Sequence, residues 1–153
     1  MIEIDDTDRR LLALLQADSA LTNQQLAGRA HVSPATALRR VRRLTEAGVI
    51  DRQVAIVSPD ALGGGLTAIL EVTLDVQSAE ALAAFEAAVA AEAAVQQCYR
   101  VASGPDFVLI VYVPDMAAYH AFVHRALTAG ANVRNVRSFF SVKRSKFEPA
   151  LPL

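Results

Sequence analysis

The chain has 153 residues, of which 53% are hydrophobic, and its 15 basic and 16 acidic side chains leave a formal net charge of −1. This composition excludes a disordered chain, and the length allows one domain or two small ones. Cys98 is the only cysteine, which excludes an intrachain disulfide and a cysteine-cluster metal site. No apolar run approaches the roughly 18 residues of a membrane span. The start, MIEIDDTDRR, is unlike a secretory signal, so we expect a cytoplasmic protein without a cofactor.

The charge is unevenly distributed along the chain. Residues 1–57 carry 8 basic and 7 acidic side chains, and residues 58–125 carry 2 and 8. Residues 126–153 carry 5 basic side chains and 1 acidic one. The nearly neutral total therefore conceals two basic regions on either side of an acidic middle.

The first 50 residues are expected to form three short helices. The stretch DDTDRRLLALLQADS has aspartates at its start, where the helix dipole favours anions, and leucines on one face: Leu11, Leu14 and Leu15. A second helix begins after Thr22, because Gln25 follows at the spacing of a capping box.

A third helix is expected after the short connection HVS. Ser33 is its N-cap, and Pro34 suits the first helical position, where a missing N–H is not needed. The periodicity predicts that Leu38, Val41 and Leu44 face inward.

Four arginines surround Val41 in this helix and must spread over its outward faces: Arg39, Arg40, Arg42 and Arg43. One interpretation is a solvated charged face. The other is a helix-turn-helix, whose second helix binds DNA. We favour the second, because Glu46 is the only acid in the helix and a solubilising face often shows more i,i+4 partners. A phosphate backbone is then the natural counter-charge.

The predicted contacts with double-stranded DNA lie at the helix start and on the arginines: Ser33, Pro34, Ala35, Thr36, Arg39, Arg40, Arg42 and Arg43. Residues near the start of a recognition helix reach base edges, so Thr36, Arg39 and Arg40 are expected to read bases. Arg42 and Arg43 are expected mainly to bind phosphates.

The remaining sequence predicts a second domain. Residues 52–57 read as a short strand, within a strand and hinge linker over residues 51–65. Residues 66–153 then read as strand–helix–strand–strand–helix–strand, the order of a ferredoxin-like sandwich. The second helix of this domain has an expected inward stripe and ends at Gly130; the stripe is Met116, Tyr119, Phe122, Val123 and Leu127. The expected fold is α+β, with a helix-turn-helix domain over residues 1–50 joined to this ferredoxin-like βαββαβ domain.

One strand of the second domain is apolar on both faces. DFVLIVYV has no polar position from Phe107 to Val113, although both helices of such a domain cover the same face of its sheet. The second face therefore needs a cover, and the same sheet of another copy supplies it in a two-fold dimer. The sequence does not say which of the two faces is the outer one.

Three stretches carry a resemblance to a known family: DDTDRRLLALLQADSALTNQQLAGRAHVSPATALRRVRRLTEAGVID, VPDMAAY and VRNVRSFFSVKRSKFEPALPL. With them the chain resembles the leucine-responsive regulator/asparagine-synthesis regulator (Lrp/AsnC) family of transcription factors over essentially its whole length. The resemblance implies a sequence-specific regulator with a winged-type helix-turn-helix and a ferredoxin-like domain that dimerises and often builds octamers. It also implies that a small molecule, usually an amino acid, binds the second domain where dimers meet and shifts DNA binding or assembly.

The resemblance places the effector near the loop SGPDFVL, with Ser103, Gly104 and Asp106 as candidate contacts and Asp106 facing an α-ammonium group. Ser138, on the last strand, falls where the family has a small hydroxyl residue near the pocket. The loop is one residue shorter than in the family, and Pro105 removes a backbone N–H. Gly104-Pro105 can equally be a simple hairpin turn.

Two other functions compete with this interpretation. An enzyme is not expected, because Cys98 reads as a packed strand residue and His120 and His124 lack a third metal ligand. An architectural DNA-binding oligomer without an amino-acid effector is the stronger alternative. It would keep the arginine helix and the apolar sheet but lose the effector loop, as the shortened loop suggests.

Overall fold

The computed structural model of the chain describes residues 2–129 and 132–153, and Gly130, the expected helix end, lies outside them. The chain folds into two compact units. The first contains the residues up to Val57 together with Lys146–Leu153, and the second contains Ser58–Ser145. In this division the last eight residues pack with the first unit.

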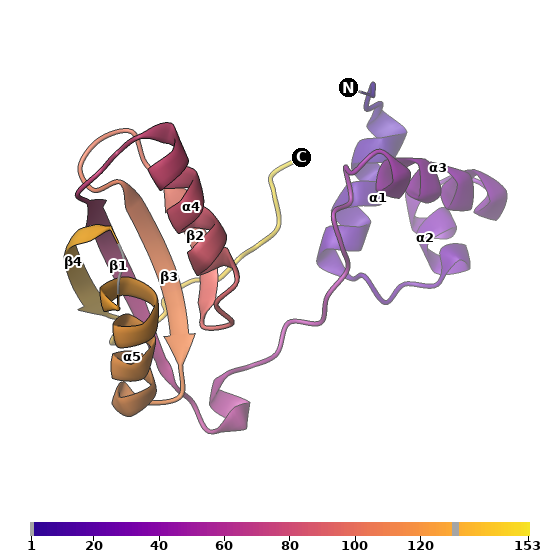
Figure 1. Cartoon of the computed structure of the whole chain (residues 1–153). Helices are drawn as coiled ribbons and strands as arrows, with labels where there is room; N and C mark the ends of the chain where they lie inside the picture. Colours follow the sequence, from indigo (N-terminus) through magenta and orange to yellow (C-terminus); the bar gives the residue numbers. More distant parts are fainter. Residues whose placement is uncertain (1, 130–131) are drawn as a thin grey trace. The chain divides into compact units, whose positions relative to one another are not determined.

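The first unit contains three helices: α1 (Asp6–Ala17), α2 (Asn23–Ala30) and α3 (Pro34–Glu46) (Figure 1). Their starts are fixed by side-chain caps, because Thr22 accepts from the backbone N–H of Gln25 and Ser33 accepts from that of Thr36. The helices bury a small core between them: Leu11, Leu26, Ala27, Ala30 and Ala37. The predicted caps of α2 and α3 are confirmed.

Two expectations for this unit are wrong. Leu38 was expected to face inward, but it is 61% exposed, while Ala37 is fully buried. The buried face of α3 is therefore the one through Ala37 and Leu44, and the small alanine lets α3 approach its neighbours closely. The expected strand over residues 52–57 is also absent. A single strand has no partner for its backbone groups within this unit, and Val54 and Ile56 are accordingly exposed.

The second unit is a four-stranded antiparallel sheet in the order β2-β3-β1-β4. Its elements, in chain order, are β1 (Leu66–Leu74), α4 (Ala79–Ala90), β2 (Val95–Arg100), β3 (Phe107–Val113), α5 (Met116–Phe122) and β4 (Val133–Phe140). This is the expected strand–helix–strand–strand–helix–strand order. Ser78 and Asp115 cap α4 and α5, as the sequence predicts.

Both helices cover the same face of the sheet (Figure 1). The core lies between them and the inward side chains of the two central strands, among them Leu70, Val72, Phe107 and Leu109. On β3 the burial alternates, with Phe107, Leu109, Val111 and Val113 buried and the residues between them half-buried. The structure thus identifies the outer face of β3, which carries Val108, Ile110 and Tyr112.

A π-helical turn over Val123–Thr128 follows α5. Within it the N–H of Ala129 bonds the carbonyl of His124, five residues back, at 2.9 Å. The wider turn brings Leu127 to the core face that Tyr119 and Phe122 already occupy. Met116 was expected in the same stripe but is 43% exposed at the first helical position, so the stripe begins at Tyr119.

Gly65 lies against the outer-face side chain of Tyr112, and a Cβ there would sit 2.5 Å from the Tyr112 hydroxyl oxygen and 2.8 Å from the carbonyl oxygen of Val113. Since the carbonyl cannot move freely, Gly65→Ala is expected to lower the free energy of unfolding of the second unit by about 1–3 kcal/mol. Gly28→Ala is the matched control, because nothing lies within 4 Å of its Cβ position in α2. It should raise the stability of the first unit by about 0.5–1 kcal/mol. Denaturant unfolding followed by circular dichroism measures both, and equal stability of Gly65→Ala and the parent would contradict this packing.

Candidate DNA-binding and effector sites

The turn before α3 positions the start of that helix. His31, the C-cap of α2, has a left-handed backbone (φ 57°, ψ 46°), which turns the chain sharply between the two helices. The side-chain amide of Asn23 donates to the carbonyl of Pro34 at 2.8 Å, which ties the start of α2 to that of α3. The hydroxyl of Ser33 donates to that of Thr36 at 2.9 Å. The start of α3 is therefore fixed at several points.

Arg40 does not point outward as a base-reading side chain would. Its guanidinium contacts Asp5 at 2.7 Å and Asp8 at 3.0 Å, and only 24% of the side chain is exposed. In this structure the Arg40 side chain is committed to α1, and its expected role in reading bases stays a prediction. Arg43, expected to bind phosphate, also donates to Asp8 but remains 46% exposed.

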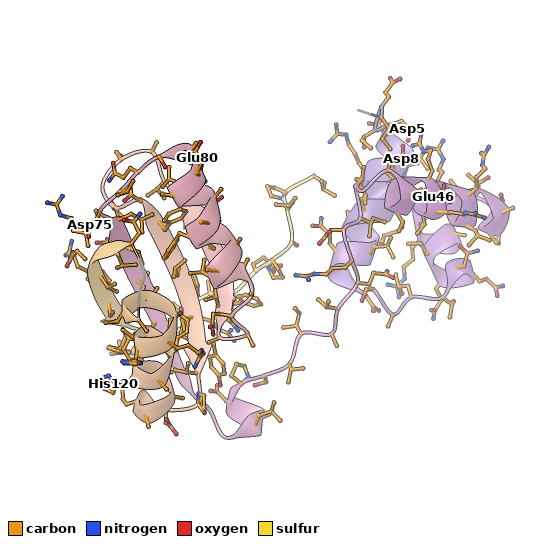
Figure 2. All side chains as sticks on the ribbon, in the orientation of Figure 1. Asp5, Asp8, Glu46, Asp75, Glu80 and His120 are labelled. Carbon is orange, nitrogen blue, oxygen red and sulfur yellow. The ribbon has the colours of Figure 1, made fainter. Side chains whose placement is uncertain are left out.

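Asp8, which is labelled with Asp5 in Figure 2, is the centre of this contact. It is fully buried. One carboxylate oxygen accepts from Arg40 and the other from Arg43. The same carboxylate completes a reciprocal capping box with Asp5 at the start of α1. The Asp8 backbone N–H, together with the Arg40 guanidinium, lowers the pKa of Asp5 to about 2. The sequence placed Asp8 at a helix start but gave no sign of its burial.

The remaining arginines of α3 face the solvent. Arg42 pairs with Glu46 at 2.7 Å, one turn along the helix, so the expected shortage of acidic partners is only partly correct. Both of these side chains are more than half exposed, so the pair is screened and easily exchanged for a phosphate. Arg39 makes no ion pair with any residue in the described ranges. It lines a concave site of about 270 Å³ with Asp5, Arg40 and Arg43.

The candidate effector loop joins β2 to β3 and is held by Asp106. The carboxylate of Asp106 accepts from the backbone N–H of Leu74 at 2.7 Å and from the amide of Gln77 at 3.1 Å. Its own backbone N–H donates to the carbonyl of Val72 at 2.9 Å. Gly104 has a φ of 87°, a conformation that favours glycine and fits a tight turn. Within one chain Asp106 thus has a structural role at the end of β1.

Ser138 lies apart from this loop. Ser138 is on β4, where it pairs with Leu70 of β1. The loop leads into β3, which pairs with the opposite edge of β1. Two strand spacings, about 10 Å, separate β4 from β3. The hydroxyl of Ser138 hydrogen-bonds that of Tyr119, whose ring packs edge-on against Phe140 at 4.9 Å between centroids. A single chain therefore gathers Ser103, Gly104 and Asp106 but not Ser138.

The groups considered for enzyme chemistry have other surroundings. Cys98 packs against the core of the second unit, and burial raises the pKa of its thiol, the opposite of what a nucleophile needs. In the described ranges, no three side chains of histidine, cysteine, aspartate or glutamate lie together as a metal site would require. None of the helices in these ranges is long and apolar enough to span a membrane.

The fold and the surface of α3 define a helix-turn-helix DNA-binding protein with a second, α+β domain. The model of winged helix-turn-helix DNA-binding domains matches residues 4–51, and that of the Lrp/AsnC ligand binding domain matches residues 67–151. The second match covers more than half of the chain, which therefore belongs to the Lrp/AsnC family of DNA-binding transcriptional regulators, a family without enzymatic activity.

Known relatives resemble the chain over its whole length. The leucine-responsive regulatory protein of Rhizobium meliloti is 38% identical over 145 residues, which cover 95% of this chain and 93% of that protein. A transcriptional regulator of Neisseria meningitidis in complex with L-methionine is 31% identical, with a TM-score of 0.89 over 98% of this chain and 97% of that one. The feast or famine regulatory protein of M. tuberculosis, also with L-methionine, is 32% identical, with a TM-score of 0.85 over 97% and 99%.

Proposed function

We propose that this regulator recognises specific DNA sequences through α3, with Arg39 as the principal base-reading arginine. Arg39 lies on the exposed surface of the helix and has no acidic partner in the described ranges, so its guanidinium is available for a base edge. An arginine can donate two hydrogen bonds to guanine, which discriminates that base from the others. This availability is the observation that carries the proposal.

The other predicted contacts take different roles around Arg39. Ser33, Pro34, Ala35 and Thr36 form the start of α3, where small side chains allow a groove to approach. Arg42 binds phosphate by exchanging its exposed contact with Glu46 for the DNA backbone. Arg43, which remains 46% exposed, binds phosphate while its contact with Asp8 is kept. Arg40 is a positioning residue, since its contacts with Asp5 and Asp8 hold α3 against α1.

Alanine variants distinguish the roles of the arginines of α3. Arg39→Ala should cost about 1–3 kcal/mol on an operator selected with the parent from random duplexes, and much less on unrelated DNA. Arg42→Ala should weaken binding to both and reduce the salt slope by about one unit. Arg40→Ala should instead lower the unfolding temperature of the first unit, which Arg39→Ala leaves unchanged. Fluorescence anisotropy and circular dichroism give the two readouts. Unchanged selectivity in Arg39→Ala would contradict its base-reading role.

We infer that two copies associate through the uncovered face of the sheet. This open face carries apolar and aromatic side chains from all four strands: Ile69, Tyr99, Val108, Ile110, Tyr112 and Phe139. Ile69, Tyr99 and Phe139 are each more than a third exposed in a single chain. A contiguous apolar patch of this kind is rare on a monomer and typical of an interface. Dimers formed in this way are the unit from which a larger assembly, such as an octamer, is built.

A lysine at the centre of the open face should prevent this association. In Ile110→Lys the buried ammonium group would lack a partner, so light scattering should report monomers or irregular aggregates where the parent is at least dimeric. Ala87→Lys adds the same charge on the exposed side of α4 and should leave the assembly unchanged. A well-folded parent that is monomeric at all concentrations would contradict the open-face interface.

We further propose that an amino acid binds the second domain and modulates DNA binding or assembly. The match to a ligand binding domain and the L-methionine complexes of two relatives support this effector class. Ser103, Gly104 and Asp106 are the candidate contacts on the loop, and Ser138 on β4. Within a single chain, β1 lies between Ser138 and the loop, so the four residues come together only when chains assemble. The effector site is then part of the oligomer.

Calorimetry with L-methionine tests this site. Asp106→Asn keeps an oxygen for the backbone N–H of Leu74 but removes the charge that would face an ammonium group. Binding heat should be saturable in the parent and lost in Asp106→Asn. Asp115→Asn is the control: it removes one carboxylate from the N-cap of α5, where asparagine also caps well, and it should keep the binding heat. Heat that persists in Asp106→Asn would place the ammonium contact elsewhere. If no amino acid gives binding heat, an architectural DNA-binding oligomer without an effector replaces this proposal. The structural role of Asp106 and the missing N–H of Pro105 favour that alternative.

A further inference from the structure

The second basic region of the sequence has no role in the sites described so far. Residues 126–147 contain all five of its lysines and arginines and no acid. The last three, Lys143, Arg144 and Lys146, are exposed and lie where the chain passes from the second unit back to the first. Neither Lys143 nor Lys146 forms an ion pair within the described ranges.

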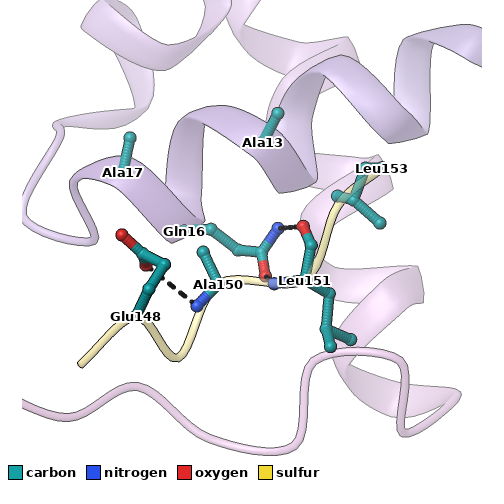
Figure 3. Close-up of a pocket in the computed structure, with 7 residues that line it drawn as sticks. All are labelled: Ala13, Gln16, Ala17, Glu148, Ala150, Leu151 and Leu153. Atoms are coloured by element: carbon teal, nitrogen blue, oxygen red, sulfur yellow. Dashed lines mark hydrogen bonds between the residues drawn. The ribbon is translucent and has the colours of Figure 1, made fainter. Parts of the chain in front are cut away.

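The chain that follows is anchored on the DNA-binding unit (Figure 3). The side-chain amide of Gln16 in α1 donates to the carbonyl of Leu151 at 3.1 Å and accepts from its backbone N–H at 2.7 Å. Ala13 and Ala17 flank this contact in a shallow pocket of about 340 Å³, which Glu148, Ala150 and Leu153 complete. Small side chains beside Gln16 thus let the tail backbone approach α1.

Hydrogen bonds rather than apolar burial hold this tail. The side chains of Leu151 and Leu153 remain 71% and 52% exposed, so the two-way contact with Gln16 is the specific part of the anchor. Lys146 is five residues before Leu151, which limits its distance from the anchor to about 17 Å of extended chain. The anchor thereby limits how far Lys146 can lie from α1.

We propose that Lys143, Arg144 and Lys146 form a second DNA contact, which binds the phosphate backbone beside the sequence that α3 occupies. A duplex presents one phosphate charge per about 1.7 Å of its axis, so phosphates are available wherever this segment meets the DNA. Anchoring reduces the conformational entropy that the segment would otherwise lose on binding. The contact is independent of sequence and increases affinity on every duplex. This inference rests on DNA binding by the first unit.

The test is the salt dependence of binding to a labelled duplex of mixed sequence, measured by anisotropy on the full-length chain. The triple variant Lys143→Gln, Arg144→Gln and Lys146→Gln should reduce the slope of log affinity against log salt by about two to three units per chain, at roughly 0.9 unit per contact. The control removes the same charge from three arginines that pair with acids in the second unit, Arg100→Gln, Arg125→Gln and Arg134→Gln. Equal slopes in the triple variant and the parent, or an equal loss in the control, would overturn the proposal.

The anchor is tested separately. Gln16→Leu removes both hydrogen bonds to Leu151 and should reduce the slope in the same direction by a smaller amount, because the cations remain but are no longer held. Gln24→Leu, on the exposed surface of α2, is the matched control. An unchanged slope in Gln16→Leu would overturn the anchoring role of the tail. If Arg39→Ala leaves DNA selectivity unchanged while the triple variant still loses its slope, the proposed role of α3 fails and this second contact stands.

Discussion

The orientation of the recognition helix depends on one buried carboxylate. Asp8 offers one oxygen to Arg40 and the other to Arg43, and these arginines are three residues apart on α3. A rotation of α3 about its axis, or a shift along it, would break at least one of the two contacts. A buried charge without its partner is costly, whereas an intact buried pair adds little over an apolar replacement. Asp8 therefore contributes geometry more than net stability, and it fixes the direction in which Arg39 points.

The two units differ in how their apolar surfaces are covered. In the first unit small residues close the core within a single chain, and the buried charge of Asp8 finds its partners there. In the second unit both helices lie on the same face, so the side chains of Ile69, Ile110 and Phe139 lie on the face that these helices leave open. The core of the DNA-binding unit is thus formed by one chain, whereas the proposed association of two copies would cover the open face of the sheet.

Local sequence patterns predicted the helices and strands, apart from the strand expected over residues 52–57, but they did not predict the contacts between these elements. The caps at Ser33, Ser78 and Asp115 were predictable, because each depends on a residue only three positions further on. The strand order followed from the alternation of elements along the chain. The pairing of Arg40 with Asp5 joins residues 35 positions apart, and no periodicity reveals such a contact.

The other differences also have physical causes. Leu38 and Ala37 are adjacent in the sequence, and only the distance to α1 and α2 decides which of them the helix buries. The carboxylate of Asp106 suits a ligand in the sequence but meets the backbone of Leu74 in the fold. Residues 52–57 have the composition of a strand, but a strand also needs a partner, which the composition does not supply.

The anchoring of the tail also has a consequence for the synthesis of the chain. Gln16 and Leu151 are separated by 135 positions, so the helices of the first unit leave the ribosome long before the tail. Domains generally fold as units in the order of their synthesis, and the three helices form their core without the tail. The newborn DNA-binding unit is therefore folded before the tail is made, and the contact between Gln16 and Leu151 forms after the core of the three helices.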